Sequence, residues 1–158
     1  MDFFTAIHAL LKAIKQVLTR RPYRTPWELI PGIGAASAYA DGDAFGTGGF
    51  LRVPKMGIIK QVIFLDRDDE GIAKELALFT QRLNTIPTDN SAFDPADADL
   101  RNGEGHINIA SSDFANWGSN RMGTTFVPDL DYEAPRGRLF YYWITKGVDN
   151  IAAGSEPL

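Results

Sequence analysis

The clearest pattern of apolar and polar positions lies near the start of the chain. Apolar residues recur there at alternating spacings of four and three, as on one face of a helix. The apolar positions are Phe3, Ile7, Leu10, Ile14 and Val17. Pro22 then ends the helix, because its ring clashes with the preceding turn. We therefore predict a helical arm over residues 1–21, which needs a partner because a helix this short is marginal alone in water.

The pattern changes twice after the arm. Residues 22–35 are rich in proline and glycine, which predicts an extended linker. From residue 36 onward, short runs of β-branched and aromatic residues alternate with turn residues. We therefore predict a β body over residues 36–158, with the arm as a separate unit.

Three stretches of the body carry the strongest strand patterns. Gly57–Leu65 is apolar on both faces near its end, which is typical of a central strand. Leu139–Thr145 is aromatic and β-branched throughout. Phe45–Val53 is rich in glycine and is followed by Pro54, which predicts an edge strand or a bulge.

Residues 72–83 fit both a helix and a strand. The residues at helical spacing are Ile72, Leu76, Phe79 and Leu83. We choose the strand, mainly on the resemblance given below. Met56–Phe79 then becomes the central hairpin of the body, closed by the turn Asp66–Gly71.

The remaining segments have weaker patterns. Residues 84–103 predict a long polar surface loop that contains one helical turn. The pattern of residues 111–123 also predicts a loop, with Phe114 and Trp117 as plugs, apolar side chains that pack into the body. Residues 124–127 predict a short strand that stops before a proline.

Composition narrows the class of protein. The chain has 158 residues, of which 44% are hydrophobic, so it is long enough for one domain with a real core. It has no cysteine, which excludes disulfides, thiolate metal sites and a cysteine nucleophile. The first 30 positions hold five basic and two acidic residues, which gives them a net charge of +3. Because the whole chain has a net charge of −4, the remaining residues carry −7. The basic arm could therefore lie on the acidic body of a neighbour, or its charge could serve only the solubility of the helix.

The acidic turn is the only stretch that suggests a metal. Asp66, Asp68 and Glu70, followed by Gly71, match the opening of a calcium loop. The match fails at the twelfth position, where Ala77 stands in place of a bidentate glutamate. This excludes an EF-hand and leaves a weak calcium candidate, against which we favour a solvated hairpin turn.

The other reactive side chains do not form a catalytic motif. A second acidic cluster consists of Asp94, Asp97 and Asp99, for which helix capping and turn formation are the favoured roles. The two histidines, His8 and His106, lie far apart in the sequence. Nucleotide-binding and hydrolase fingerprints are absent from the sequence. The sequence therefore predicts no catalytic residue and no cofactor.

Six short segments resemble a known group of proteins. They are Tyr39–Gly46, Gly57–Gln61, Asp66–Gly71, Leu76–Phe79, Pro87–Phe93 and Leu139–Ile144. In this order they resemble the small virion proteins of tailed bacteriophages, over about residues 38–146. The resemblance implies a β-sandwich that coats or caps the particle, chiefly as an oligomeric capsid decoration (cement) protein. The helix and linker at the start are not part of this pattern, so a neck, tail or fibre-base position stays open.

These observations predict a mainly β protein, an antiparallel β-sandwich or jelly-roll-like body with an N-terminal α-helical arm. We expect a non-enzymatic structural protein on the phage capsid surface, made in the host cytoplasm. Its expected partners are its own copies, with a trimer favoured, and the major capsid protein or other virion proteins. We expect neither nucleic acid nor membrane as a partner. The alternatives are a module that binds carbohydrate or a host receptor and, third, a small glycosidase.

Overall fold

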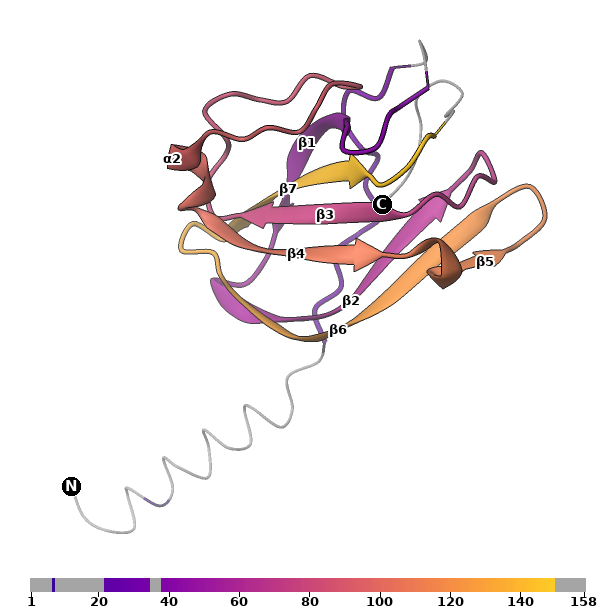
Figure 1. The fold of residues 1–158 in the computed structure, drawn as a ribbon. Coiled ribbons are helices and arrows are strands. Elements are labelled where there is room, and N and C mark those ends of the chain that lie inside the picture. The colour runs from indigo at the N-terminus through magenta and orange to yellow at the C-terminus, as the bar shows by residue number, and fades with distance from the viewer. Residues whose placement is uncertain (1–6, 8–21, 35–37, 150–158) are drawn as a thin grey trace.

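The structure is a computed structural model that describes residues 7, 22–34 and 38–149. Within these residues the fold is mainly β, with two antiparallel sheets (Figure 1). The four-stranded sheet has the order β1 (Ala44–Arg52), β7 (Arg138–Thr145), β3 (Lys74–Phe79), β4 (Gly103–Ile109). The three-stranded sheet has the order β2 (Met56–Asp66), β6 (Arg121–Glu133), β5 (Phe114–Asn116). The helical segments are α2 (Asp97–Leu100) and the 3-10 turn η1 (Ser111–Asp113).

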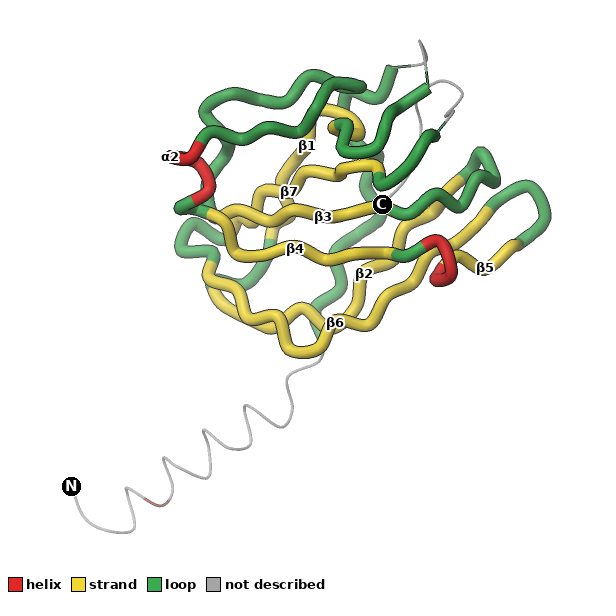
Figure 2. The backbone as a smooth tube through the Cα atoms, viewed as in Figure 1, coloured by secondary structure: helices red, strands yellow, loops and turns green. Residues whose placement is uncertain are grey.

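The two sheets form two layers, between which the chain crosses repeatedly. The connections β1–β2, β2–β3, β4–β5 and β6–β7 each pass from one sheet to the other. Only β3–β4 and β5–β6 join neighbours within a described sheet. Figure 2 shows long loops gathered on the side of the four-stranded sheet that faces away from the three-stranded one.

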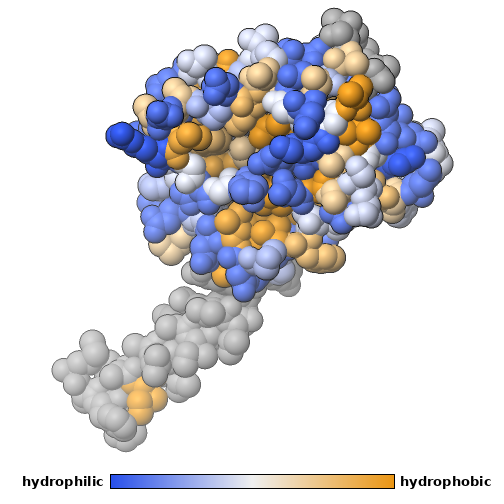
Figure 3. Space-filling view, viewed as in Figure 1, coloured by the Kyte–Doolittle hydropathy of each residue, from blue (hydrophilic) through white to orange (hydrophobic). Residues whose placement is uncertain are grey.

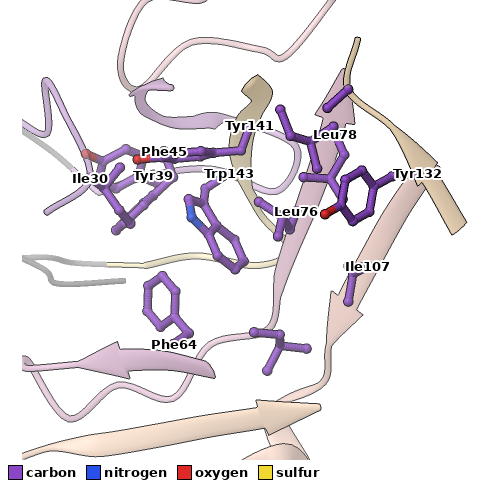
Figure 4. Close-up of a cluster of buried hydrophobic side chains, with 13 residues drawn as sticks. Ile30, Tyr39, Phe45, Phe64, Leu76, Leu78, Ile107, Tyr132, Tyr141 and Trp143 are labelled. Atoms are coloured by element: carbon purple, nitrogen blue, oxygen red, sulfur yellow. The ribbon is translucent and has the colours of Figure 1, made fainter. Parts of the chain in front are cut away.

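The main core lies between the layers and takes side chains from both. Trp143 of β7 meets Phe64 of β2 edge-on, with ring centroids 5.1 Å apart. In Figure 4 the Trp143 indole lies between Phe64 and Tyr141. Leu78 of β3 and Ile109 of β4 are buried in the same cluster. Each such side chain contributes about 1.5–3 kcal/mol through removal of apolar surface from water.

A second apolar cluster covers the opposite face of the four-stranded sheet. Tyr142 and Ile144 of β7 point to this side, where Leu83 and Phe93 of the long loop after β3 pack over them. The Leu83 backbone N–H donates to Tyr142 Oη at 3.1 Å. Strand β7 is therefore buried on both faces, which explains its uninterrupted run of apolar and aromatic residues.

Several strand predictions are confirmed. Residues 72–83 do contain a strand, β3, although the apolar residues of this segment follow a helical spacing. Strand β1 lies at a sheet edge and contains a register shift between Phe45 and Gly49. Gly48 has φ +71 in this bulge, and a Cβ there would collide with the ring of Tyr142. The glycines of β1 thus allow close approach to β7.

The predicted hairpin Met56–Phe79 is wrong. Strands β2 and β3 belong to different sheets, and β2 pairs only with β6 among the described strands. The stretch Gly57–Leu65 therefore lies at a sheet edge rather than at a sheet centre. Its apolar character on both faces arises because Phe64 enters the core while Ile63 and Leu65 are half-buried on the other side.

The predictions for residues 111–127 also need correction. The short strand 124–127 is part of β6, which continues through Pro128. Proline is tolerated because β2 shifts register opposite it, between Ile59 and Gln61, so no regular ladder bond is lost. Residues 111–123 include η1 and β5, and Trp117 is 67% exposed rather than a plug. Phe114 does pack against the core.

The arm falls almost wholly outside the described residues. Only Ile7 is described, in helical conformation and 38% exposed. Phe3, Leu10, Ile14 and Val17 lie outside the described residues. The linker is described over residues 22–34, and its Ile30 is buried in the main core. Among the described residues, no helix is long and apolar enough to cross a membrane.

Candidate interaction surfaces

The acidic turn after β2 is held by its own first residue. Asp66 is only 3% exposed, and its Oδ1 accepts from the Asp68 N–H at 2.9 Å. Its Oδ2 accepts from the Gly71 N–H at 2.6 Å. The Arg121 guanidinium donates to Asp69 Oδ1 at 2.8 Å, which joins the turn to β6. The turn is therefore a partly buried crossing between the sheets, and not the solvated hairpin turn that the sequence suggested.

This arrangement bears on the weak calcium candidate. Both carboxylate oxygens of Asp66 already accept backbone hydrogen bonds, while Asp68 and Glu70 are half-buried. In the part of the chain that the structure describes, no group of three or more metal-ligating side chains is suitably placed for an ion. The carboxylate of Asp66 thus has a structural task, to close the turn.

The second acidic cluster is divided by the fold. Asp99 is 2% exposed in α2, where its carboxylate accepts from the Asn84 backbone N–H at 3.1 Å and from Asn84 Nδ2 at 2.6 Å. Asp94 and Asp97 are exposed. The pair Asn84–Asp99 therefore closes the base of the long loop, in keeping with the turn role expected for this cluster. His106 is exposed on β4, and His8 lies outside the described residues.

Two of the segments that carry the family resemblance meet in space. Residues 42–44 and 90–93 run side by side, with backbone hydrogen bonds from Ala44 N to Ser91 O at 2.7 Å and from Phe93 N to Gly42 O at 2.9 Å. The Asn90 N–H donates back to the Ala44 carbonyl at 2.9 Å. The long loop is thereby fastened to the start of β1.

We call the paired residues 42–44 and 90–93 the loop assembly. The carboxylate of Asp89 is the main hydrogen-bond acceptor beside it. Its Oδ1 accepts from Tyr39 Oη at 2.8 Å and from the Gly46 N–H at 2.7 Å. Its Oδ2 accepts from the Gly34 N–H at 2.7 Å. Burial raises the pKa of Tyr39, and the hydrogen bond to the charged Asp89 raises it further. Sequence reasoning missed this role, because an aspartate beside asparagine in a polar loop is typical of a solvated turn.

The face of the three-stranded sheet that points away from the core carries exposed apolar residues. Phe126 is 78% exposed, Met56 66% and Ile58 49%. Their neighbours Val127 and Ile59 pack against the core, so strand alternation turns these three side chains outward. Half-buried Ile63, Leu65 and Met122 extend the same face. We call these six residues the outer β2–β6 face, which sequence reasoning missed because it placed β2 at the centre of a sheet.

Polar side chains border this outer face. The exposed ion pair Lys60–Asp129 joins β2 to β6. Asp131 and Glu133 stand opposite Ile58 and Met56 in the strand register. An apolar strip with a charged border is typical of a surface that contacts another protein.

A second exposed apolar region lies where the linker meets the body. Tyr23 is 58% exposed, Trp27 48% and Leu29 58%. Tyr23 Oη donates to the Arg52 carbonyl at 2.8 Å, and Tyr23 borders an open depression of about 340 Å³ with Phe50. Aromatic side chains thus gather where the described linker begins.

One further hollow and one further apolar patch lie on the surface. An open depression of about 440 Å³ lies over the outer side of the four-stranded sheet, lined by Phe79, Phe93 and His106 among others. The ion pair between Lys146 and Glu75, 3.1 Å, lies in its wall. Figure 3 shows a further apolar patch between the positions of β4 and β6, where the two layers meet. Both depressions are shallow surface features rather than an enclosed pocket.

No family model, curated protein or solved structure matches this chain.

Proposed function

We propose that this chain is a non-enzymatic structural protein of a tailed-phage virion, of the capsid decoration type. In this role it associates with its own copies, with a trimer favoured, and binds the major capsid protein or other virion proteins on the outside of the particle. The two antiparallel sheets, with β1 and β7 as neighbours and most connections crossing between sheets, support a jelly-roll-like sandwich body. The predicted helical arm completes the architecture.

The observation that carries this proposal is the loop assembly around Asp89. The resemblance rests partly on Tyr39–Gly46 and Pro87–Phe93, which are far apart in the sequence. Their backbones pair, and Asp89 joins them through Tyr39 and Gly46. Because the two segments lie together in the fold, this contact supports a resemblance in the arrangement of the folded chain. It argues against a chance similarity between two short peptides.

The surfaces support an assembly role in a second way. The outer β2–β6 face presents Phe126, Met56 and Ile58 to solvent, which costs free energy that contact with another protein recovers. The basic arm and acidic body offer complementary charges between neighbouring copies. Binding that occurs only in the assembled state stabilises the assembly by mass action.

Deletion of residues 1–21 tests this proposal. The arm is proposed to bundle with its copies or to dock on an adjacent subunit, so the truncated chain should lose oligomerisation or particle binding while its body stays folded. Sedimentation equilibrium gives the oligomeric state, and near-ultraviolet circular dichroism reports the packing around Trp143. A truncated chain that keeps both its oligomeric state and its particle binding contradicts the proposed role of the arm.

The alternative with a specific observation in its favour is a carbohydrate- or receptor-binding module. The open depression beside the linker is bordered by Tyr23 and Phe50, and Trp27 is exposed nearby. Exposed aromatic rings are the side chains on which sugar rings stack. Glycan-array binding by the chain that is lost on Trp27→Ala would favour this alternative. A neck, tail or fibre-base position remains the alternative location on the particle.

A further inference from the structure

A lysine and an aspartate are enclosed together in the apolar interior. The side chains of Lys74 and Asp149 are each 1% exposed, and Lys74 Nζ contacts Asp149 Oδ2 directly. The rings of Phe45 and Phe64 lie 5.3 and 5.6 Å from this nitrogen. The nitrogen also donates to the Ile72 carbonyl at 3.1 Å. Such complete burial of both partners is uncommon for an ion pair, because desolvation costs several kcal/mol per charge.

The backbone fixes both partners in place. Lys74 begins β3 and is paired with Thr145 on one side and Ile109 on the other. Asp149 is bridged to Tyr39, with hydrogen bonds of 2.8 Å from Tyr39 N to Asp149 O and 3.2 Å in the reverse direction. The nitrogen and the carboxyl group are therefore held in contact without further ordering. Reactants held in this way show effective concentrations far above those reached in solution.

Burial of the Asp149 carboxyl group favours its uncharged form. Burial raises the pKa of Asp149, the charge and hydrogen bond of Lys74 lower it, and the charges of Glu70 and Asp66 raise it again. Asp149 Oδ1 is buried and has no hydrogen-bond partner among the described residues. A carboxylate oxygen left in this condition is costly, and conversion of the pair to a neutral amide removes this cost. An amide forms when an amine condenses with a carboxylic acid and releases water.

We propose that Lys74 and Asp149 form an intramolecular isopeptide bond. The lone pair of Nζ attacks Cγ of Asp149, a C–N bond forms, and the C–O bond to one carboxyl oxygen breaks. That oxygen leaves as water with one proton from the acid and one from the amine nitrogen. No atom changes its oxidation state, so the reaction needs no oxidant, reductant or activating co-reactant.

The bond would link the segment that follows β7 to an inner strand of the four-stranded sheet. That strand is β3, and the bond closes a loop of 75 sequence positions. Cross-links over long loops stabilise a fold by restricting the unfolded chain. This inference does not depend on the proposed virion role, because it rests only on the interior of the body.

The mass of the denatured full chain tests the proposal. The cross-linked chain is lighter than its sequence by the mass of one water molecule, and trypsin yields one branched product that joins residues 68–82 to residues 147–158. The bond blocks cleavage after Lys74, which is why residues 68–82 stay together. A full sequence mass, with residues 75–82 and 147–158 recovered as separate peptides, overturns the proposal.

Three variants separate this bond from other causes of water loss. Lys74→Arg keeps the positive charge but should restore the full mass. Lys146→Arg, in the exposed pair with Glu75, should keep the loss and serves as the matched control. Asp149→Asn should lose one ammonia molecule instead of one water. If the water loss persists in Lys74→Arg, it arises elsewhere, for instance by cyclisation at Asp41–Gly42, and the proposal is wrong.

Discussion

Tyr39 Oη donates a 2.8 Å hydrogen bond to Asp89 Oδ1 across 50 positions of sequence. The same carboxylate accepts from the backbone N–H groups of Gly34 and Gly46. One side chain thus ties together the linker, the start of β1 and the long loop that follows β3. Gly46 and Tyr39 are buried, so loss of the carboxylate would leave their donors without an acceptor, whereas water can reach the exposed Gly34 N–H.

Replacement of Asp89 by alanine should destabilise the body by about 3 kcal/mol, since three hydrogen bonds to a charged acceptor are lost. Tyr39→Phe, which removes one of them, should cost about 1 kcal/mol. Urea unfolding followed by tryptophan fluorescence measures both. Asp94→Ala is the matched control, because Asp94 is exposed in the same loop and its loss should change stability by less than about 0.5 kcal/mol. Equal effects of Asp89→Ala and Asp94→Ala would contradict the role of Asp89.

Stability should fall at alkaline pH through the buried tyrosines. Burial raises the pKa of both Tyr39 and Tyr141 above the ordinary tyrosine value of 10.0. Below that value both states of the chain keep the phenolic proton, so the contribution is fully present. Above it the unfolded chain loses a proton that the folded chain retains, and the free energy of unfolding decreases as pH rises.

Urea unfolding at about pH 9 and about pH 11 measures this change on either side of the ordinary tyrosine pKa. Absorbance at a phenolate wavelength should show ionisation of Tyr39 and Tyr141 only as the body unfolds. Tyr39→Phe should reduce the loss of stability between the two pH values. A free energy of unfolding that stays constant over this range would contradict the burial of these hydroxyls.

The turn after β2 should depend on Asp66 and not on a metal ion. Asp66→Ala leaves the Asp68 and Gly71 N–H groups without their acceptor and should cost about 2 kcal/mol. Calcium or EDTA at millimolar concentration should leave the melting temperature unchanged, because both oxygens of Asp66 are already engaged. A rise in melting temperature with calcium that disappears in Asp68→Ala would revive the calcium candidate.

The outer β2–β6 face should matter for association but not for folding. Phe126→Ser removes an apolar side chain that is 78% exposed, so the monomer should keep its stability within about 0.5 kcal/mol. Oligomerisation or particle binding should weaken by about tenfold or more, as expected on loss of an aromatic anchor. Leu100→Ser, at a site 53% exposed on α2, is the matched control and should change neither. Unchanged association of the Phe126 variant would exclude this face as a contact.

The strands themselves were largely predictable, but their partners were not. The residue pattern located β1 and β7 correctly, because it reports which faces are buried, whereas β3 was chosen mainly on the resemblance. Apolar faces do not specify which strand lies alongside, and β2 was wrongly paired with β3 for this reason. The chain passes to the other sheet at Asp66–Gly71, where the buried Asp66 carboxylate holds the turn through backbone hydrogen bonds.

The important polar residues were the least predictable part. Asp89 and Lys74 have ordinary sequence surroundings, and charged residues in loops and strands are usually solvated. Their burial depends on partners 50 and 75 positions away, Tyr39 and Asp149, which no local pattern indicates. The arm pattern is strong in the sequence, yet four of its five apolar positions lie outside the described residues, so its role stays a prediction.

The proposal that this chain is a virion structural protein is tested most directly by the protein content of the particles themselves. Phage particles purified from the source culture, treated with nuclease and banded by density, can be analysed by quantitative mass spectrometry. The proposal predicts that the chain is present in many copies per particle, in a fixed ratio to the major capsid protein. A chain that is abundant in the infected-cell lysate but absent from the purified particles would contradict it.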